Sequence, residues 1–448
     1  MKLYLTLLVS ICFLLTTITA QKKLNDSNTP LHLLKPDYPI PYGIPDKNDV
    51  KKTLDRIKSY LEKNTPYEMN DASGKKIIDF NNINSSSVLK KGDFRIISYE
   101  WGVTYSAMLK IAELTGDNTY KDYTENRLNF IAEVLPYFSK QMGQGLDWAD
   151  KGPFRNLLNP HALDDCGAMC TAMIKSKLGG SKAKLDYLID NHVNYILHKE
   201  YKLADGTLAR NRPQPNTLWL DDMFMGVPAL AWKGKLSGDP SYYEAAVNQI
   251  ALFHKKMYNH DKKIFMHGWV EDMEHHPQFH WARANGWALL TLTEVLDALP
   301  ADYPGRALVL NVYKEHVVGL QKYQSGKGFW HQLLDKTDSY LETSATAIYT
   351  YCIAHGIHQG WLDKEAFAPT ALLGWNAVST KINTFGQVEG TCVGTGMAFD
   401  PAFYYHRPVS AYAAHGYGPT LLAGAEIFAL LSNNKFEIND SSVQLLKK

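Results

Sequence analysis

Two pairs of adjacent acids are the residues in this sequence whose types and spacing could do chemistry. Asp221 and Asp222 follow Trp219 after one intervening leucine, and Asp164 and Asp165 form the second pair. A carboxyl group buried beside an indole and another carboxylate has a raised pKa, so it can donate a proton near neutral pH. We therefore expect one acid of the first pair, Asp221 or Asp222, to supply a general acid.

The second pair, at positions 164 and 165, could hold sugar hydroxyls or orient a water molecule. A simpler alternative exists for both pairs. Aspartate is a common N-cap, so one acid of each pair could cap a helix while the other is solvated.

His267, Arg283 and Trp287 could complete a site for a charged sugar. Arg283 suits bidentate binding of a carboxylate, Trp287 could provide an aromatic wall, and His267 could bind a hydroxyl or a carboxylate. A lone histidine is more often structural, which is the alternative for His267. The histidines at 275, 276 and 280 match no metal-ligand spacing, so we expect no metal and no other cofactor.

Helical patterns that would position these residues cover most of the chain. Gly-Asp and Gly-Asp-Pro gaps at 116–117 and 238–240 have the residue types of helix ends and predict antiparallel hairpins. Long connections at 199–220 and 258–281 alternate with such gaps, and strand-like segments occur only near 77–80 and 263–267. We predict helices over 49–63, 100–115, 119–138, 162–177, 182–198, 221–236, 240–257, 282–298, 304–322, 343–358, 364–379 and 418–432.

The distinctive residues begin every second predicted helix. They are Trp101, Asp164-Asp165, Trp219 to Asp222, Arg283 to Trp287, Glu342 to Ser344 and the segment 415–419. If six inner helices run parallel inside six outer ones, all these residues meet at one end of an all-helical barrel of six hairpins. Helix N-termini also favour an anionic ligand through their free N–H groups. The sequence thus predicts one all-α catalytic domain over 49–448.

The first twenty residues have the pattern of a signal peptide. Lys2 precedes an apolar run from Leu3 to Leu15, and small residues lead to a cut expected after Ala20. No cysteine stands at the cut, so we expect no lipid anchor and a periplasmic or secreted protein. Residues 21–48 are rich in Pro, Asn, Asp and Lys and are expected to form an extended N-terminal arm.

Charge and cysteine content narrow the function further. Residues 1–20 contain one of the 47 basic residues and none of the 46 acidic ones, which leaves 46 of each. This balance argues against nucleic acid as a partner. Four cysteines remain, and we expect Cys166, Cys170, Cys352 and Cys392 to be buried thiols.

Four segments together resemble glycoside hydrolase family 105, the unsaturated rhamnogalacturonyl hydrolases, and more distantly family 88, the unsaturated glucuronyl hydrolases. They are WLDDMFMGVP, HWARANGW, LETSATA and HGYGPTLLAGAE, and the resemblance covers about residues 50–432. It implies an (α/α)6 barrel. It also implies removal of the 4,5-unsaturated uronic acid that polysaccharide lyases leave at the non-reducing end of oligosaccharides.

The resemblance also implies roles for individual residues. Asp221 matches the catalytic acid of the family through Trp219, and either Asp164 or Asp165 matches the second acid, with Asp165 preferred. His267, Arg283 and Trp287 match positions that contact substrate. The family usually has Arg-Gly-x-Gly-Trp where this chain has an alanine at 284, which could change the local turn.

In such an enzyme, the acid protonates the double bond and water adds to it. The rhamnose-linked products of rhamnogalacturonan or ulvan are the expected substrates, and the sequence does not choose between them.

Two alternative functions remain. One is another (α/α)6 carbohydrate enzyme, a polysaccharide lyase or a sugar epimerase. The other is a non-catalytic glycan-binding protein.

Overall fold

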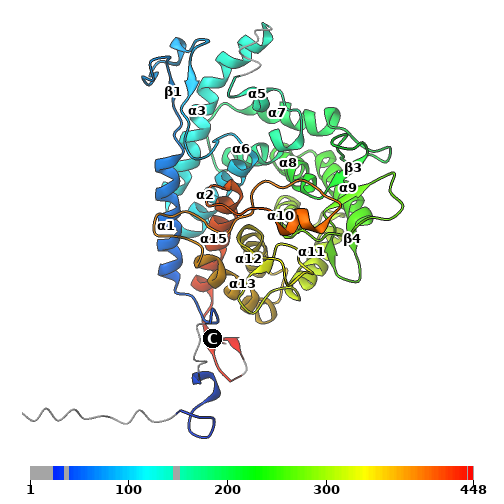
Figure 1. The fold of residues 1–448 in the computed structure, drawn as a ribbon. Helices are drawn as coiled ribbons and strands as arrows, with labels where there is room; N and C mark the ends of the chain where they lie inside the picture. Colours follow the sequence, from blue (N-terminus) through cyan, green and yellow to red (C-terminus); the bar gives the residue numbers. More distant parts are fainter. Residues whose placement is uncertain (1–23, 35–39, 145–151, 441, 447–448) are drawn as a thin grey trace, which may run out of the picture.

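Six inner helices form a closed ring, and six outer helices surround it (Figure 1). In this computed structural model, which describes residues 24–34, 40–144, 152–440 and 442–446, each inner helix packs against two inner neighbours and one outer helix. The inner helices are α2 (Tyr99–Thr115), α6 (Gly167–Leu178), α8 (Asp221–Ser237), α10 (Ala282–Ala298), α12 (Thr343–His358) and α15 (Tyr417–Asn433). The outer helices are α1 (Lys47–Asn64), α3 (Asn118–Gly143), α7 (Asp186–Asn194), α9 (Pro240–Met257), α11 (Arg306–Gln321) and α13 (Lys364–Ser379). The fold is an (α/α)6 barrel, as predicted.

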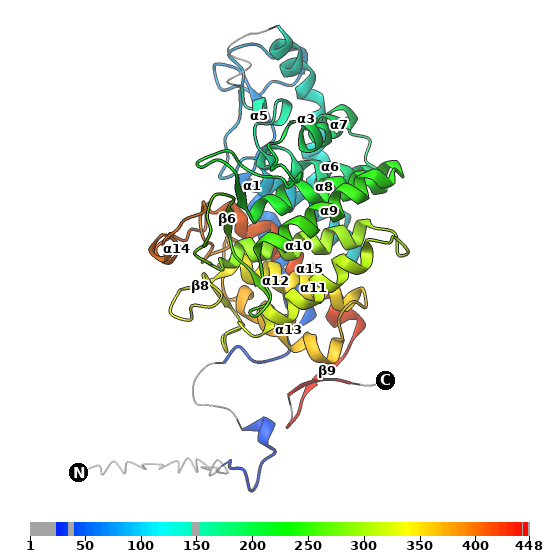
Figure 2. The ribbon, with the colours of Figure 1, turned by 90° about the vertical axis from the view of Figure 1, so that its right-hand side faces the viewer.

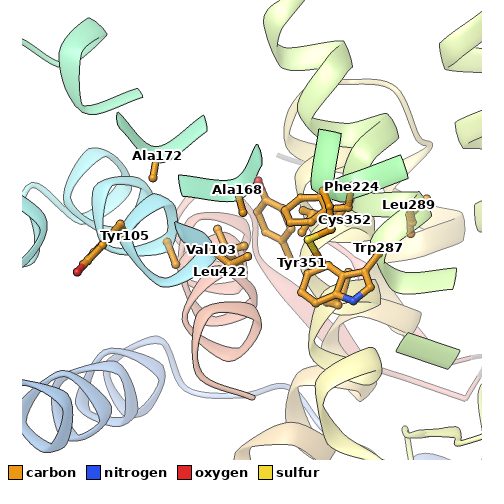
Figure 3. Close-up of a cluster of buried hydrophobic side chains, with 14 of the residues drawn as sticks. Val103, Tyr105, Ala168, Ala172, Phe224, Trp287, Leu289, Tyr351, Cys352 and Leu422 are labelled. Atoms are coloured by element: carbon orange, nitrogen blue, oxygen red, sulfur yellow. The ribbon is translucent and has the colours of Figure 1, made fainter. Parts of the chain in front are cut away.

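The two layers differ in how their residues are buried. Every residue of α12 from Thr343 to Ile357 is buried, so this helix contacts protein on all sides. In α1 the buried residues recur every three or four positions, which is the pattern of a helix with one apolar face. The outer layer thus shields a ring of helices that are apolar all round, and Figure 3 shows Phe224, Trp287 and Leu422 in the core that they share.

Helix ends confirm the predicted hairpins. Gly116 ends α2 and Gly238 ends α8, both in the left-handed conformation at φ 74° that glycine adopts without strain. Asp117 and Asp239 then cap α3 and α9 by accepting hydrogen bonds from backbone N–H groups. Each hairpin therefore reverses the chain, so all six inner helices run in the same direction.

Short strands and helices gather at the N-terminal ends of the inner helices, on the left of Figure 2, where β6, β8 and α14 are seen. Strand β3 (Thr217–Trp219) pairs with β6 (Gly268–Val270), β4 (Tyr258–Asn259) with β5 (Ile264–Phe265), and β7 (Trp330–His331) with β8 (Leu341–Glu342). Elsewhere β1 (Met69–Asn70) pairs with β2 (Val88–Leu89), and β9 (Phe436–Ile438) with β10 (Val443–Leu445). The short helices are α5 (Arg155–Leu158), α14 (Pro401–Tyr405), the 3-10 turns Leu31–Leu33, Phe80–Asn82, Leu163–Asp165 and Ala414–Gly416, and the π turn Tyr195–Lys199.

Two predictions about local structure were wrong. The segment 77–80 is not a strand, because Phe80 already begins a 3-10 turn capped by Asp79. The helix expected from 162 begins at Gly167, because Asp164 and Asp165 lie in a separate 3-10 turn before it. The strand candidate at 263–267 is confirmed in β5.

The N-terminal predictions are only partly open to comparison. The signal peptide expected at 1–20 lies outside the described residues. Part of the arm contacts the C-terminal hairpin, since His32 Nδ1 lies 2.9 Å from Asp440 Oδ1 and Tyr42 accepts a hydrogen bond from the backbone N–H of Val443.

Among the described helices, none combines the length and the apolar character that crossing a membrane requires. The four cysteines are free and buried, as expected.

Glycines permit the close approach of inner helices near their N-termini. A Cβ atom at Gly167 would lie 1.5 Å from the carbonyl oxygen of Met225 in α8, and one at Gly102 would lie 2.5 Å from the backbone of Ala168. These contacts involve backbone atoms, which cannot move aside as a flexible side chain can. The packing of α2, α6 and α8 therefore requires glycine at both positions.

We predict that Gly167→Ala lowers the free energy of unfolding by at least about 1–3 kcal/mol, because α6 and α8 must separate to admit the methyl group. Urea denaturation of the variant and the wild type measures the change. Gly43→Ala is the matched control, since a Cβ there meets nothing within 4 Å. Equal denaturation midpoints for both variants would contradict the proposed contact.

Candidate active site

The β3–β6 pair brings His267 to Asp221. Trp219 pairs with Gly268, and the backbone N–H of Leu220 donates to the carbonyl of His267. This register places His267 Nε2 2.9 Å from Asp221 Oδ2, while Tyr404 Oη of α14 lies 2.7 Å from His267 Nδ1. Asp221 is 8% exposed and His267 is fully buried. A proton can therefore be held at Asp221 or passed to the imidazole within one hydrogen-bonded chain.

Arg210 joins the two acid pairs, and sequence reasoning missed it. Its guanidinium donates to both carboxylate oxygens of Asp222, at 2.8 and 2.6 Å, and to Asp164 at 3.0 Å. It also lies over the Trp219 ring, with Cζ 4.1 Å from the ring centroid. Both oxygens of Asp222 therefore accept hydrogen bonds from Arg210, whereas Asp221, the other acid of this pair, contacts His267. We call Arg210, Asp222 and Asp164 the arginine clamp.

The two acids of the second pair differ in their surroundings. Both oxygens of Asp165 are occupied, one by the side-chain amide of Asn156 at 2.8 Å and one by the backbone N–H of His161 at 2.9 Å. Within the described residues, the side chain of Asp164 pairs only with Arg210. Burial raises the pKa of Asp164 to about 6, against the lowering effect of Arg210. The geometry thus favours Asp164 as the second acid, whereas the sequence analysis prefers Asp165.

Arg283 and Trp287 lie deeper than their expected roles require, since each is 1% exposed. The Arg283 guanidinium donates to the carbonyl oxygens of Cys392 and Val393, at 2.6 and 2.7 Å. Trp287 stacks on Phe224, with centroids 4.8 Å apart. The structure therefore favours supporting roles for both, in place of the direct carboxylate and stacking contacts expected from the sequence. Arg283 fixes the 392–393 segment, and Trp287 supports Phe224.

Tyr99 and His415 contribute a further pair at the N-termini of α2 and α15. Tyr99 Oη lies 2.5 Å from His415 Nε2. Burial, together with the nearby Arg283 charge, lowers the pKa of His415 well below its usual value, so this imidazole is neutral. The sequence placed His415 at a helix start but gave no sign of its partner, because Tyr99 lies 316 positions away.

Three cavities surround the clamp. The first, of about 270 Å³, is lined by Tyr99, Asp164 and Asp165 among others. The second, of about 530 Å³, shares both acids with the first. The third, of about 240 Å³, lies against Arg210 and Asp222 and also includes Glu200. Burial and the Asp222 charge raise the pKa of Glu200 to about 7. The opening at this end of the barrel is therefore hollow, polar and rich in acids with raised pKa values.

A different charged network lies at the opposite end of the inner helices. His355 bridges Glu426 and Asp297, at 2.6 and 2.8 Å, and His358 lies 3.0 Å from Glu426. Although burial opposes it, pairing with the two acids raises the pKa of His355 to about 9. His355, His358 and Glu426 are close enough to share a metal ion, but they already satisfy one another by hydrogen bonds. This cluster is far along the helices from the acid pairs and supports the fold.

Comparison with known proteins agrees with this architecture. A model of Glycosyl Hydrolase Family 88 matches residues 60–431. The chain belongs to Glycosyl Hydrolase Family 88. A possible member of the GH105 family from Salmonella enterica serovar Paratyphi A has the same fold, with a TM-score of 0.67 and 21% identity over 88% of this chain and 96% of that one. This family 88 chain is therefore a glycoside hydrolase by family and an (α/α)6 barrel by fold.

Two curated relatives have names that specify an activity. The chain is 27% identical over 223 residues to the unsaturated 3S-rhamnoglycuronyl hydrolase of Formosa agariphila, an alignment of 47% of this chain and 58% of that protein. It is 25% identical over 288 residues to the unsaturated rhamnogalacturonyl hydrolase YesR of Bacillus subtilis, covering 62% of this chain and 80% of that protein. The family 88 chain thus matches little more than half the length of the first relative.

We predict that Asp164→Asn becomes more stable relative to the wild type as the pH rises from about 4 to about 7. The folded-state pKa of Asp164 is about 6, against an ordinary value of 3.8. Between these values the folded protein binds more protons than the unfolded chain, so ionisation of Asp164 lowers the stability of the wild type as the pH rises. Asparagine stays neutral and escapes this loss.

Urea denaturation of both proteins across this pH range measures the difference. Asp302→Asn, at an exposed acid in the connection between α10 and α11, is the control. A difference for Asp164→Asn that does not change with pH would contradict the raised pKa.

Proposed function

We propose that this chain removes the 4,5-unsaturated uronic acid from the non-reducing end of lyase-generated oligosaccharides. The observation that carries the proposal is the Asp221–His267 contact at the N-terminal opening of the barrel, next to the arginine clamp. Membership of the family and the names of the curated relatives support the same chemistry. Rhamnose-linked substrates fit both names, and the parent polysaccharide is rhamnogalacturonan or ulvan.

The first step is protonation of the double bond. Asp221, protonated, delivers its proton to C4 of the unsaturated ring, and positive charge develops at C5, where the ring oxygen stabilises it. A positioned acid of this kind contributes about 10²–10⁴-fold to the rate. His267 holds the carboxyl group in place and can return a proton to it, since its other nitrogen contacts Tyr404. The substrate carboxylate lies where six helix N-termini favour negative charge.

The second step is addition of water. Water attacks C5 and gives up a proton to a carboxylate, a role that we assign to Asp164, which Arg210 links to the first acid pair. The resulting hemiketal opens by breaking its bond from C5 to the ring oxygen, which leaves a ketone at C5. The ring oxygen remains on C1 as a hydroxyl group, so C1 is now a hemiacetal. Its bond to the glycosidic oxygen breaks, the hydroxyl proton is transferred to that oxygen, and C1 becomes an aldehyde as the attached sugar leaves. Because water adds at C5, the two-carboxylate displacement rules of ordinary glycosidases do not govern this reaction.

We expect Asp221→Asn to reduce kcat by about 10²–10⁴-fold without loss of folding, since an amide cannot donate the proton. The loss of ultraviolet absorbance of the conjugated double bond follows turnover on lyase-digested rhamnogalacturonan and ulvan. Circular dichroism checks the fold.

Asp222→Asn distinguishes the role of Asp222 from that of Asp221. It removes the buried carboxylate that pairs with the half-buried Arg210, so we expect it to lower the melting temperature, which Asp221→Asn should not do. An active Asp221→Asn beside a folded but inactive Asp222→Asn would instead assign the acid to Asp222. Binding of the oligosaccharide with no change in absorbance by the wild type would favour a glycan-binding protein.

A further inference from the structure

Two arginines stand on the outer side of the second acid pair. Arg155 and Arg212 line the cavity of about 530 Å³ that also contains Asp164 and Asp165. Arg155 comes from the short helix α5, and Arg212 from the connection that leads to β3. We call these two residues the arginine rim. They approach one cavity from segments that are far apart in the sequence.

The acids that line this cavity are already engaged by other groups. Asp165 accepts hydrogen bonds from Asn156 and from the backbone N–H of His161, and Asp164 is bound by Arg210. Glu200, which shares the neighbouring cavity with Arg212, has its pKa raised to about 7 by burial and the charge of Asp222. Arg210 therefore offsets part of the charge of Asp164, and the raised pKa of Glu200 reduces its charge near neutral pH, whereas the donors that hold Asp165 are neutral.

Among the described residues, the rim arginines have no acidic partner. Within the described part of the chain, neither Arg155 nor Arg212 forms an ion pair, whereas the neighbouring Arg210 is bound by two carboxylates. Arg155 donates to His161 Nε2 at 2.7 Å, a contact that orients its guanidinium without neutralising it. Arg212 is exposed. Two guanidinium groups, neither with a carboxylate partner in the described segments, thus line one polar cavity.

We propose that the arginine rim is a subsite for an oxyanion, a sulfate ester or a carboxylate, on the sugar attached to the unsaturated uronate. A guanidinium group binds such oxyanions through paired N–H donors, which a single ammonium group cannot do. This inference rests on the proposed function, because it places the unsaturated ring at Asp221. The clamp leads from there through Asp222 and Arg210 to Asp164, and the attached sugar extends past Asp164 to the rim.

The test compares matched unsaturated disaccharides whose second sugar carries a sulfate ester, a carboxylate or neither. Wild type, Arg155→Gln, Arg212→Gln and the double variant are assayed for kcat/KM by loss of double-bond absorbance. Lys327→Gln, which removes one exposed charge from another loop, is the control. We expect the double variant to lose about tenfold or more in kcat/KM on a charged disaccharide, mostly through KM, and little on the neutral one.

The outcomes separate the subsite from the reaction itself. A loss confined to the sulfated or to the carboxylated sugar identifies which oxyanion the rim binds. Equal kcat/KM values of wild type and double variant on all three sugars would overturn the subsite and leave the proposed function standing. If the wild type consumes none of them, the proposed function fails, and calorimetric affinities of the same sugars for the same variants then decide the subsite. Equal affinities would overturn it.

Discussion

Six parallel helices in a closed ring must bring their N-termini to one opening, and the site depends on this constraint. Asp221, Arg283 and Tyr99 each lie in the first turn of a different inner helix, yet all lie within electrostatic reach of one another. Short strand pairs and connections before these helices then supply His267, Arg210 and the 392–393 segment. The helices fix where the site lies, and the connections determine which groups it contains.

The two ends of the barrel differ in how their acids are paired with cationic groups. At the far end, His355, Glu426 and Asp297 pair with one another, and the pKa of Glu426 falls to about 2 because, although burial opposes it, its histidine partners stabilise the charged form. At the opening, Asp164 and Asp222 share Arg210, and burial raises the pKa of Asp164 to about 6. Full pairing supports the fold, whereas incomplete pairing leaves acids that can exchange protons.

The sequence predicted the helices well, because their apolar periodicity and their glycine and aspartate ends are local signals. It also singled out Asp221, which follows a recognisable tryptophan, and His267, at the end of a predicted strand segment, and the structure brings these two side chains into contact. It missed Arg210, Tyr404 and the Tyr99–His415 pair, since these contacts join distant segments through loops without a regular pattern. The sequence also could not predict how far a side chain is buried. It marked Arg283 and Trp287 as site residues, but their burial depends on tertiary packing.

Turnover in D₂O, followed by NMR of the released sugar, tests most directly whether the enzyme protonates the double bond. The account predicts loss of the C4–C5 double bond and one deuterium at C4, on a single face, before enolisation of the C5 ketone exchanges that position. A released uronic acid that keeps its double bond and carries no deuterium at C4 would contradict it, because the glycosidic bond would then have been cleaved by ordinary hydrolysis.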